Sequence, residues 1–204
     1  MTDHRSVGRP RLHDPEIERG LLLNAAFTAL RDEGIDFTIS DILLGANVST
    51  RTFYRHFESK DSLLAAMYLG DAQKAADRLV LRLSATASSL EAVTAWVDEI
   101  FSFLRSGRRA ERVMVLGSII GYTSSAFGNA VTVGRDLLIA PLREAINSGL
   151  AAGEFHFEDS TTVVSLVGAA VMHAAGISTP LIHLEQHDQR ATLAFVLRAL
   201  GHRA

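Results

Sequence analysis

Residues 38–57 read TISDILLGANVSTRTFYRHF, and this stretch decides the fold class. Thr38, with Asp41 three residues later, has the pattern of a capping box that opens a short helix. Asn47 and Ser49 then suit a tight turn, because asparagine tolerates a positive φ and serine is a favourable N-cap. A second short helix follows, so the stretch predicts a helix, a turn and a helix.

The second of these helices separates apolar from polar side chains. Phe53 and Phe57 stand four positions apart and therefore share one face. The remaining side chains are mostly hydrogen-bond donors and cations: Thr50, Arg51, Tyr54, Arg55 and His56. An apolar back with a donor-rich front suits a helix that lies in the major groove of DNA while the preceding helix braces it.

Helices are also expected on both sides of this stretch. Asp14 and Pro15 suit the N-cap and first position of a helix that stops at Gly34. Ser59 can cap a long helix that begins at Lys60. Helical spacing predicts five more helices, near 88–106, 109–126, 127–152, 159–178 and 187–202. The expected fold class is therefore all-α, with an N-terminal three-helix unit and a larger C-terminal helical domain.

Composition narrows the class of protein. The 204 residues carry 20 Lys and Arg against 23 Asp and Glu, so any DNA-binding surface must be a local basic face. The absence of cysteine excludes disulfides, thiolate zinc sites and cysteine nucleophiles. The N-terminus has no apolar core typical of a signal peptide, and the longest apolar stretch, 163–177, is too short and mixed for a bilayer. We therefore expect a cytoplasmic protein with no membrane partner.

Six groups of residues occur in order between positions 22 and 64. They are Leu22-Leu23-x-Ala25-Ala26, Gly34, Thr38-Ile39-x-x-Ile42, Val48-Ser49, Thr52-Phe53-Tyr54-Arg55-His56-Phe57 and Ser59-Lys60-Asp61-x-Leu63-Leu64. In this order and spacing they resemble the TetR family of transcriptional regulators. Two positions depart from the family pattern, since Asn47 replaces a usual glycine and Leu43 a usual alanine. We expect the turn to survive and the helix around Leu43 to repack.

The resemblance implies three segments: a flexible basic arm at 1–13, a helix-turn-helix DNA-binding domain at 14–66, and a regulatory and dimerisation domain at 67–204. It implies that Thr50 and Arg51 read bases, and that Arg55 reaches bases or phosphate. The expected phosphate contacts are Thr38, Thr52, Tyr54, His56 and Lys60. The alternative for each is a structural role, such as packing of His56 on the first helix.

The arm contains Gly8-Arg9-Pro10-Arg11, which resembles the core of an AT-hook. Arg9 and Arg11 are expected to enter a narrow minor groove. The alternative is a tail that only adds positive charge.

The resemblance also implies a homodimer on an inverted repeat of double-stranded DNA, and a repressor released by an unknown small molecule, which the apolar residues of the C-terminal segment indicate is hydrophobic. Small and apolar residues on the last two helices form the expected dimer interface: Ala170, Ala174, Leu193 and Leu197. Their alternative is closure of the subunit's own core. The expected ligand cavity uses mainly large apolar side chains, with one histidine as polar anchor: Trp96, Phe103, Met114, Tyr122, Phe127 and His173.

Two other classes of protein fit the sequence less well than a regulator. An enzyme is disfavoured, because residues 117–121 do not form a nucleophile elbow and no HExxH motif or glycine-rich phosphate loop occurs. No cofactor is expected, and His183 and His187, although four residues apart, are more simply exposed histidines than metal ligands. The third class is an architectural or protein-binding helical module, which an absence of salt-sensitive DNA binding would favour.

Overall fold

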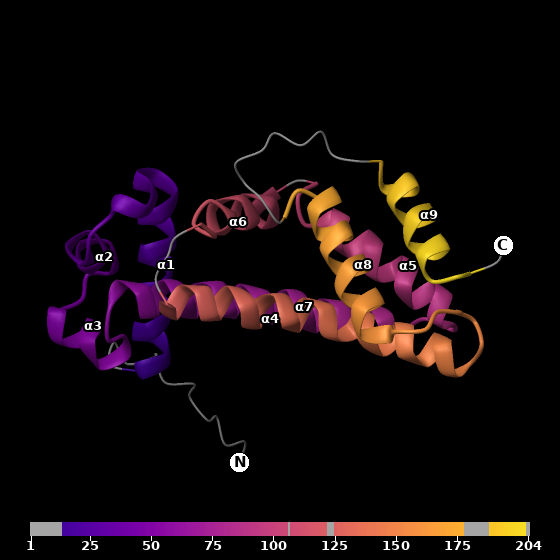
Figure 1. The fold of residues 1–204 in the computed structure, drawn as a ribbon. Coiled ribbons are helices and arrows are strands. Elements are labelled where there is room, and N and C mark those ends of the chain that lie inside the picture. The colour runs from indigo at the N-terminus through magenta and orange to yellow at the C-terminus, as the bar shows by residue number, and fades with distance from the viewer. Residues whose placement is uncertain (1–13, 106, 122–124, 178–187, 203–204) are drawn as a thin grey trace, which may run out of the picture. The chain divides into compact units, whose positions relative to one another are not determined.

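The computed structural model describes residues 14–105, 107–121, 125–177 and 188–202 (Figure 1). Within these residues the chain forms α-helices, one short 3-10 helix (η1) and no strand, which confirms the all-α prediction. The elements are α1 (Pro15–Glu33), η1 (Gly34–Asp36), α2 (Ile39–Ala46), α3 (Thr50–His56), α4 (Lys60–Leu83), α5 (Ser89–Ser102), α6 (Gly107–Gly117), α7 (Ser125–Ala151), α8 (Ser160–Ala174) and α9 (Gln189–Ala199). They group into two compact units that divide between Met67 and Tyr68.

The N-terminal unit contains α1, η1, α2, α3 and the first turns of α4. The Asp14 side chain caps α1 by accepting the Glu16 N–H at 2.9 Å, and Gly34 ends α1 with φ 71°, as the sequence predicts. Apolar side chains from every α-helix of the unit meet in one core: Leu22, Ala26, Leu30, Ile42, Phe53, Phe57, Leu63 and Leu64. This burial holds the two short helices α2 and α3, which are too short to be stable alone.

The C-terminal unit contains the rest of α4 and helices α5 to α9. Its core surrounds Trp96, which is fully buried and whose indole N–H donates to the Leu138 carbonyl at 2.9 Å. Pro141 stands inside α7 and has no N–H to donate to the preceding turn of that helix. The other large buried side chains of this core include Ile100, Leu142, Ile146, Phe155, Val171 and Val196.

Several helix boundaries differ from the sequence prediction; α8 ends at Ala174 and α9 at Ala199, each a few residues before the predicted end. The helix expected at 109–126 is α6, which begins at Gly107 and ends at Gly117, because residues 118–121 form turns. The helix expected to reach residue 106 ends at Ser102, after which the chain turns. No helix in the described ranges has the length and apolarity needed to cross a bilayer.

Candidate DNA interface

The predicted helix-turn-helix is present, and local hydrogen bonds explain why it forms. In the capping box of α2, the Asp41 N–H donates to the Thr38 hydroxyl at 3.3 Å, and the Thr38 N–H donates to the Asp41 carboxylate at 2.7 Å. Asn47 ends α2 in the left-handed region, with φ 52° and ψ 49°. Ser49 then caps α3 by accepting the Thr52 N–H at 3.1 Å. The turn therefore survives the replacement of glycine by asparagine.

Helix α3 has a buried back and an exposed front. Phe53 is fully buried and Phe57 nearly so, and their ring centroids lie 6.0 Å apart. Thr50, Arg51 and Tyr54 are exposed on the other side of the helix. The Tyr54 ring is half-exposed although it meets the Phe53 ring edge-on. These three side chains are free to present a cation and hydroxyl groups to a ligand of this face.

Arg55 and His56 have a partner inside the unit, which is Glu18 of α1. The Glu18 carboxylate accepts hydrogen bonds from the Arg55 guanidinium and from His56 Nε2, the latter at 3.0 Å. These bonds, that to His56 first, lower the pKa of the Glu18 carboxyl below its ordinary value. Glu18 and His56 are buried, whereas the Arg55 side chain is 53% exposed. The packing of His56 on the first helix, one of the two sequence alternatives, is thus observed.

Lys60 also has internal partners. Its ammonium donates to the backbone carbonyls of Ile35 and Phe37 and lies 4.1 Å from the centroid of the Phe37 ring. Partial burial lowers the pKa of this ammonium. Lys60 therefore links the start of α4 to the segment between α1 and α2 by hydrogen bonds. Its position in the sequence did not indicate this role.

The remaining predicted DNA contacts divide into two groups. The hydroxyls of Thr38 and Thr52 belong to the caps of α2 and α3, where they bond to Asp41 and Ser49. Both threonines nevertheless remain accessible, Thr38 more than Thr52. The predicted contacts of the arm lie outside the described residues: Arg9 and Arg11.

Residues 22–67 match the family model described as bacterial regulatory proteins, tetR family. The match begins in α1, includes all of the helix-turn-helix and ends in α4. The chain thus carries the DNA-binding domain of the TetR family of transcription regulators at residues 22–67. A search of curated proteins gives no match.

Solved structures share the fold over nearly the whole chain. A TetR transcription regulator from Haloarcula marismortui ATCC 43049 has a TM-score of 0.70 and 18% identity, covering 91% of this chain and 97% of that one. FadR from Bacillus subtilis in complex with stearoyl-CoA has a TM-score of 0.71 and 15% identity, covering 91% and 99%. RolR in complex with resorcinol has a TM-score of 0.65 and 21% identity, covering 95% and 92%. At these identities the likeness concerns the fold.

The buried aromatic residues predicted to line a ligand cavity have packing roles in the C-terminal unit. Trp96 is bonded to a backbone carbonyl of α7, as described above. The Phe103 ring lies 5.8 Å from the Arg78 guanidinium, and the Phe127 ring meets the Tyr68 ring edge-on at 5.6 Å. Burial raises the pKa of the Tyr68 hydroxyl. These contacts place the three aromatic residues in the hydrophobic interior.

Two other predicted cavity residues lie at the surface. Met114 is 63% exposed on α6, and His173 is exposed on α8. The apolar run around His173 suggested burial, but Val171, Met172 and Ala174 are buried while His173 points to the opposite side of the helix. The expected polar anchor therefore does not point into the described core. Tyr122 lies outside the described residues.

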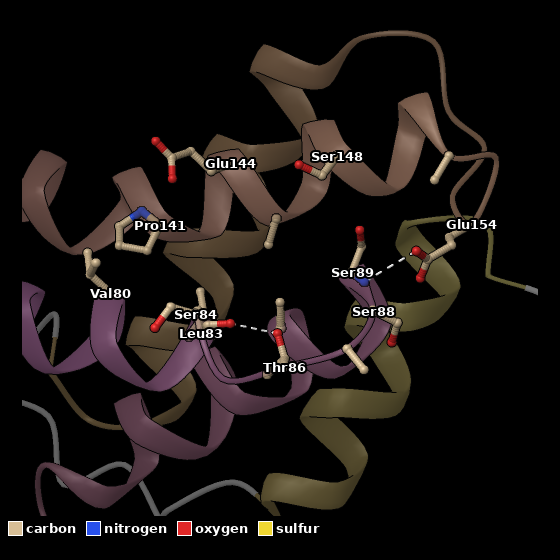
Figure 2. Close-up of a pocket in the computed structure, with 14 residues that line it drawn as sticks. Val80, Leu83, Ser84, Thr86, Ser88, Ser89, Pro141, Glu144, Ser148 and Glu154 are labelled. Carbon is tan, nitrogen blue, oxygen red and sulfur yellow. Dashed lines mark hydrogen bonds between the residues drawn. The ribbon is translucent and has the colours of Figure 1, made fainter.

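A pocket of about 460 Å³ opens between the end of α4, the start of α5 and α7 (Figure 2). Its apolar lining includes Val80, Leu83 and Pro141, and hydroxyl and carboxylate groups complete it: Ser84, Thr86, Ser88, Ser89, Ser148, Glu144 and Glu154. Glu154 accepts the N–H groups of Ser89 and Leu90, and these bonds lower the pKa of its carboxyl. None of the predicted cavity residues that the structure describes lines this pocket, and no local sequence pattern indicated it.

The predicted dimer residues mostly face the subunit's own core. Ala174 is buried, Leu193 and Leu197 pack against the core, and Ala170 is half-buried. The large apolar side chains that α8 and α9 expose are instead Leu166, at 65%, and Phe195, at 50%. These two side chains lie on the faces of α8 and α9 turned away from the core, and the sequence did not single them out because helical phase could not be assigned from it alone.

Proposed function

We propose that this regulator is a cytoplasmic repressor that binds an inverted-repeat operator as a homodimer and releases it when a hydrophobic small molecule binds the C-terminal unit. The exposed front of α3 carries the proposal. Thr50, Arg51 and Tyr54 project from a helix whose back is locked in the core by Phe53 and Phe57. A rigid helix with an exposed arginine suits base reading in a major groove.

Each exposed polar group then has a stated role. Arg51 forks to a guanine, and Thr50 contacts an adjacent base. Arg55 reaches bases or phosphate with the donors that Glu18 leaves free. The phosphate contacts are Thr38, Thr52, Tyr54 and Lys60, whereas His56, bonded to Glu18, supports α3 from its buried side. Minor-groove contacts come from Arg9 and Arg11. Lys60 can serve because an ammonium has three donors and the two carbonyls occupy two of them.

The dimer is proposed to form through the outer faces of α8 and α9. Leu166 and Phe195 are large apolar side chains exposed on these helices, and such residues mark interaction surfaces when they cluster. Ala169 is also exposed on α8 and would permit close helix approach. Ala170 remains part of this surface, whereas Leu193 and Leu197 would support it from the core side.

The ligand is proposed to be a hydrophobic small molecule. RolR and FadR, which share the fold, were solved with resorcinol and stearoyl-CoA, two organic ligands with apolar parts. The C-terminal unit is rich in buried aromatic and aliphatic side chains that can repack around such a ligand. Ligand binding would favour a conformer that does not bind the operator, so operator must weaken ligand binding by the same factor.

Selection of duplexes from a random library, followed by binding measurements at fixed salt, tests the DNA assignment. Enriched inverted repeats are expected, and Arg51→Ala should cost about 1–3 kcal/mol per half-site and relax preference at one base pair. Arg31→Ala removes the same charge from an exposed site on α1 and is the matched control. Equal losses in the two variants, or no enriched repeat, would contradict the proposal.

A thermal-shift screen of hydrophobic compounds tests the signal. A true inducer should stabilise the free protein more than the operator complex and should release the operator in a binding assay. A compound that stabilises both equally and leaves DNA affinity unchanged would not be an inducer.

A further inference from the structure

We infer that Glu18 is a specificity-determining positioning residue: it holds the Arg55 guanidinium against α1, so that this arginine reads the operator from a fixed place and is withheld from indiscriminate phosphate binding. The inference rests on the proposed DNA-binding role of α3. Glu18 itself is not placed in contact with DNA, because its side chain is only 5% exposed.

The geometry joins two helices that are distant in sequence. Glu18 lies in the first turn of α1, and its carboxylate accepts hydrogen bonds from two consecutive residues of α3, Arg55 and His56. His56 is 9% exposed, so the imidazole closes the buried side of the cluster. The Arg55 side chain is 53% exposed, so the guanidinium is bound at one end and accessible at the other.

Burial of the Glu18 carboxylate between α1 and α3 is energetically costly. Burying a charge is costly unless it is paired, and a hydrophobic residue of similar volume packs at least as well. A negative charge in a DNA-binding unit also repels phosphates. The pairing is useful where Arg55 must be pre-organised, because an unrestrained arginine has many rotamers and must be ordered when it binds.

The guanidinium has five N–H donors in a rigid fork. With one edge held by Glu18, only the remaining donors can reach DNA, and they do so from one position relative to α3. Loss of the carboxylate would free the whole fork to follow the nearest phosphate. Binding to arbitrary DNA would then tighten, while discrimination between operator and other sequences would fall.

Binding to arbitrary DNA is expected to tighten while discrimination for the operator falls. These opposite changes distinguish a positioning role of Glu18 from a purely structural one. A carboxylate that only stabilised the fold would, when replaced, weaken binding to operator and to other DNA together. Glu18→Gln keeps the shape and a hydrogen-bonding oxygen but removes the charge. Glu16→Gln removes the same charge from an exposed position in the same turn of α1 and is the matched control.

The experiment measures dissociation constants for the best library-selected duplex and for a shuffled duplex over a range of salt concentrations, with circular dichroism to verify folding. One added phosphate contact steepens the salt slope by about 0.9, which is about a 5-fold gain at 0.15 M salt. Glu18→Gln should show this gain on shuffled DNA together with a lower selectivity ratio, whereas Glu16→Gln should preserve the ratio. An unchanged ratio in folded Glu18→Gln, or parallel losses on both duplexes, would overturn the inference.

Two further variants tie the effect to Arg55. In an Arg55→Ala background, Glu18→Gln should no longer alter the selectivity ratio; an undiminished effect there would overturn the inference. Arg55→Lys, at a half-exposed site, keeps the charge but loses the fork, so it should lower selectivity while retaining affinity for shuffled DNA. This variant decides the matter if Glu18→Gln does not fold, since an unchanged ratio in it would overturn the inference.

The outcomes also separate this inference from the proposed function. If the wild-type chain does not distinguish any duplex, the proposed operator binding fails and the inference falls with it. If the wild-type chain is selective and Arg51→Ala relaxes that selectivity, while Glu18→Gln leaves it intact, only the role of Glu18 is refuted.

Discussion

Replacement of Lys60 by methionine tests how the N-terminal unit is held together. The ammonium donates two hydrogen bonds to backbone carbonyls, of Ile35 and Phe37, and lies 4.1 Å from the centroid of the Phe37 ring. A hydrogen bond from a charged donor contributes about 1.5–3 kcal/mol, and an exposed cation–π contact about 0.5–1 kcal/mol. Because Lys60 is partly exposed, the lower ends apply to both hydrogen bonds and to the ring contact, and Lys60→Met should lower the free energy of unfolding by about 3–4 kcal/mol.

Urea unfolding followed by circular dichroism measures this loss, which corresponds to a midpoint shift of about 1–2 M. Lys74→Met is the matched control, because Lys74 lies on the same helix with a side chain 73% exposed and only a 3.8 Å ion pair to Asp71. That variant should change stability by less than about 0.5 kcal/mol. If the two lysine variants were equally stable, the fastening role of Lys60 would be refuted.

Lys60→Met also tests, independently of stability, whether Lys60 contacts a DNA phosphate. If the third ammonium donor binds a phosphate, Lys60→Met should flatten the salt slope by about 0.9 per subunit. An unaltered slope in a folded variant would remove Lys60 from the DNA contacts while leaving its structural role in place.

Four shorter predictions concern other parts of the chain. Phe195→Arg should give a folded monomer by sedimentation velocity, and a persistent dimer would place the interface elsewhere. Asn47→Gly should raise the unfolding free energy by roughly 0.5 kcal/mol and Asn47→Val lower it by about 1–2 kcal/mol, because φ at this position is positive; reversed signs would contradict the turn. Trp96→Phe should cost about 1–3 kcal/mol in urea unfolding, since the Leu138 carbonyl loses its donor, and an unchanged midpoint would contradict that bond. Because the pKa of Glu154 is lowered, its carboxylate stabilises the fold above the pKa of the unfolded chain, near 4.3, and this stabilisation is lost as pH falls through the pKa of the folded chain. The stability difference between the wild-type chain and Glu154→Gln should therefore vanish in acid. A difference that does not depend on pH would refute the assignment.

Much of the fold is determined by signals that act within a few residues. Asp14, Thr38 with Asp41, and Ser49 cap the helices that the sequence predicts, and Asn47 adopts the expected left-handed turn. Such features are readable from the sequence because the two groups that bond are close along the chain. The alternation of Phe53 with polar neighbours likewise fixes which side of α3 is buried, since a seven-residue helix has one apolar face.

The partners of the charged side chains were not readable in this way. Glu18 meets Arg55 across 37 positions, and Lys60 meets the carbonyl of Ile35 across 25. No local pattern specifies these pairs, because they depend on how α1 packs against the rest of the unit. The sequence identified Arg55 and Lys60 as cations near a DNA-binding helix, whereas their bonds within the protein depend on how the helices pack.

In the C-terminal unit, the sequence likewise did not indicate which faces of α8 and α9 are buried. Local sequence patterns are enough to predict that α8 and α9 are helices with apolar and small residues, and that Trp96 belongs to an apolar segment. Only packing decided that Leu197 lies against the core while Phe195 is exposed, and that His173 faces outward from an apolar run. When apolar residues surround a helix on nearly all sides, composition no longer marks the buried face, and the neighbouring helices select it by the fit of their side chains.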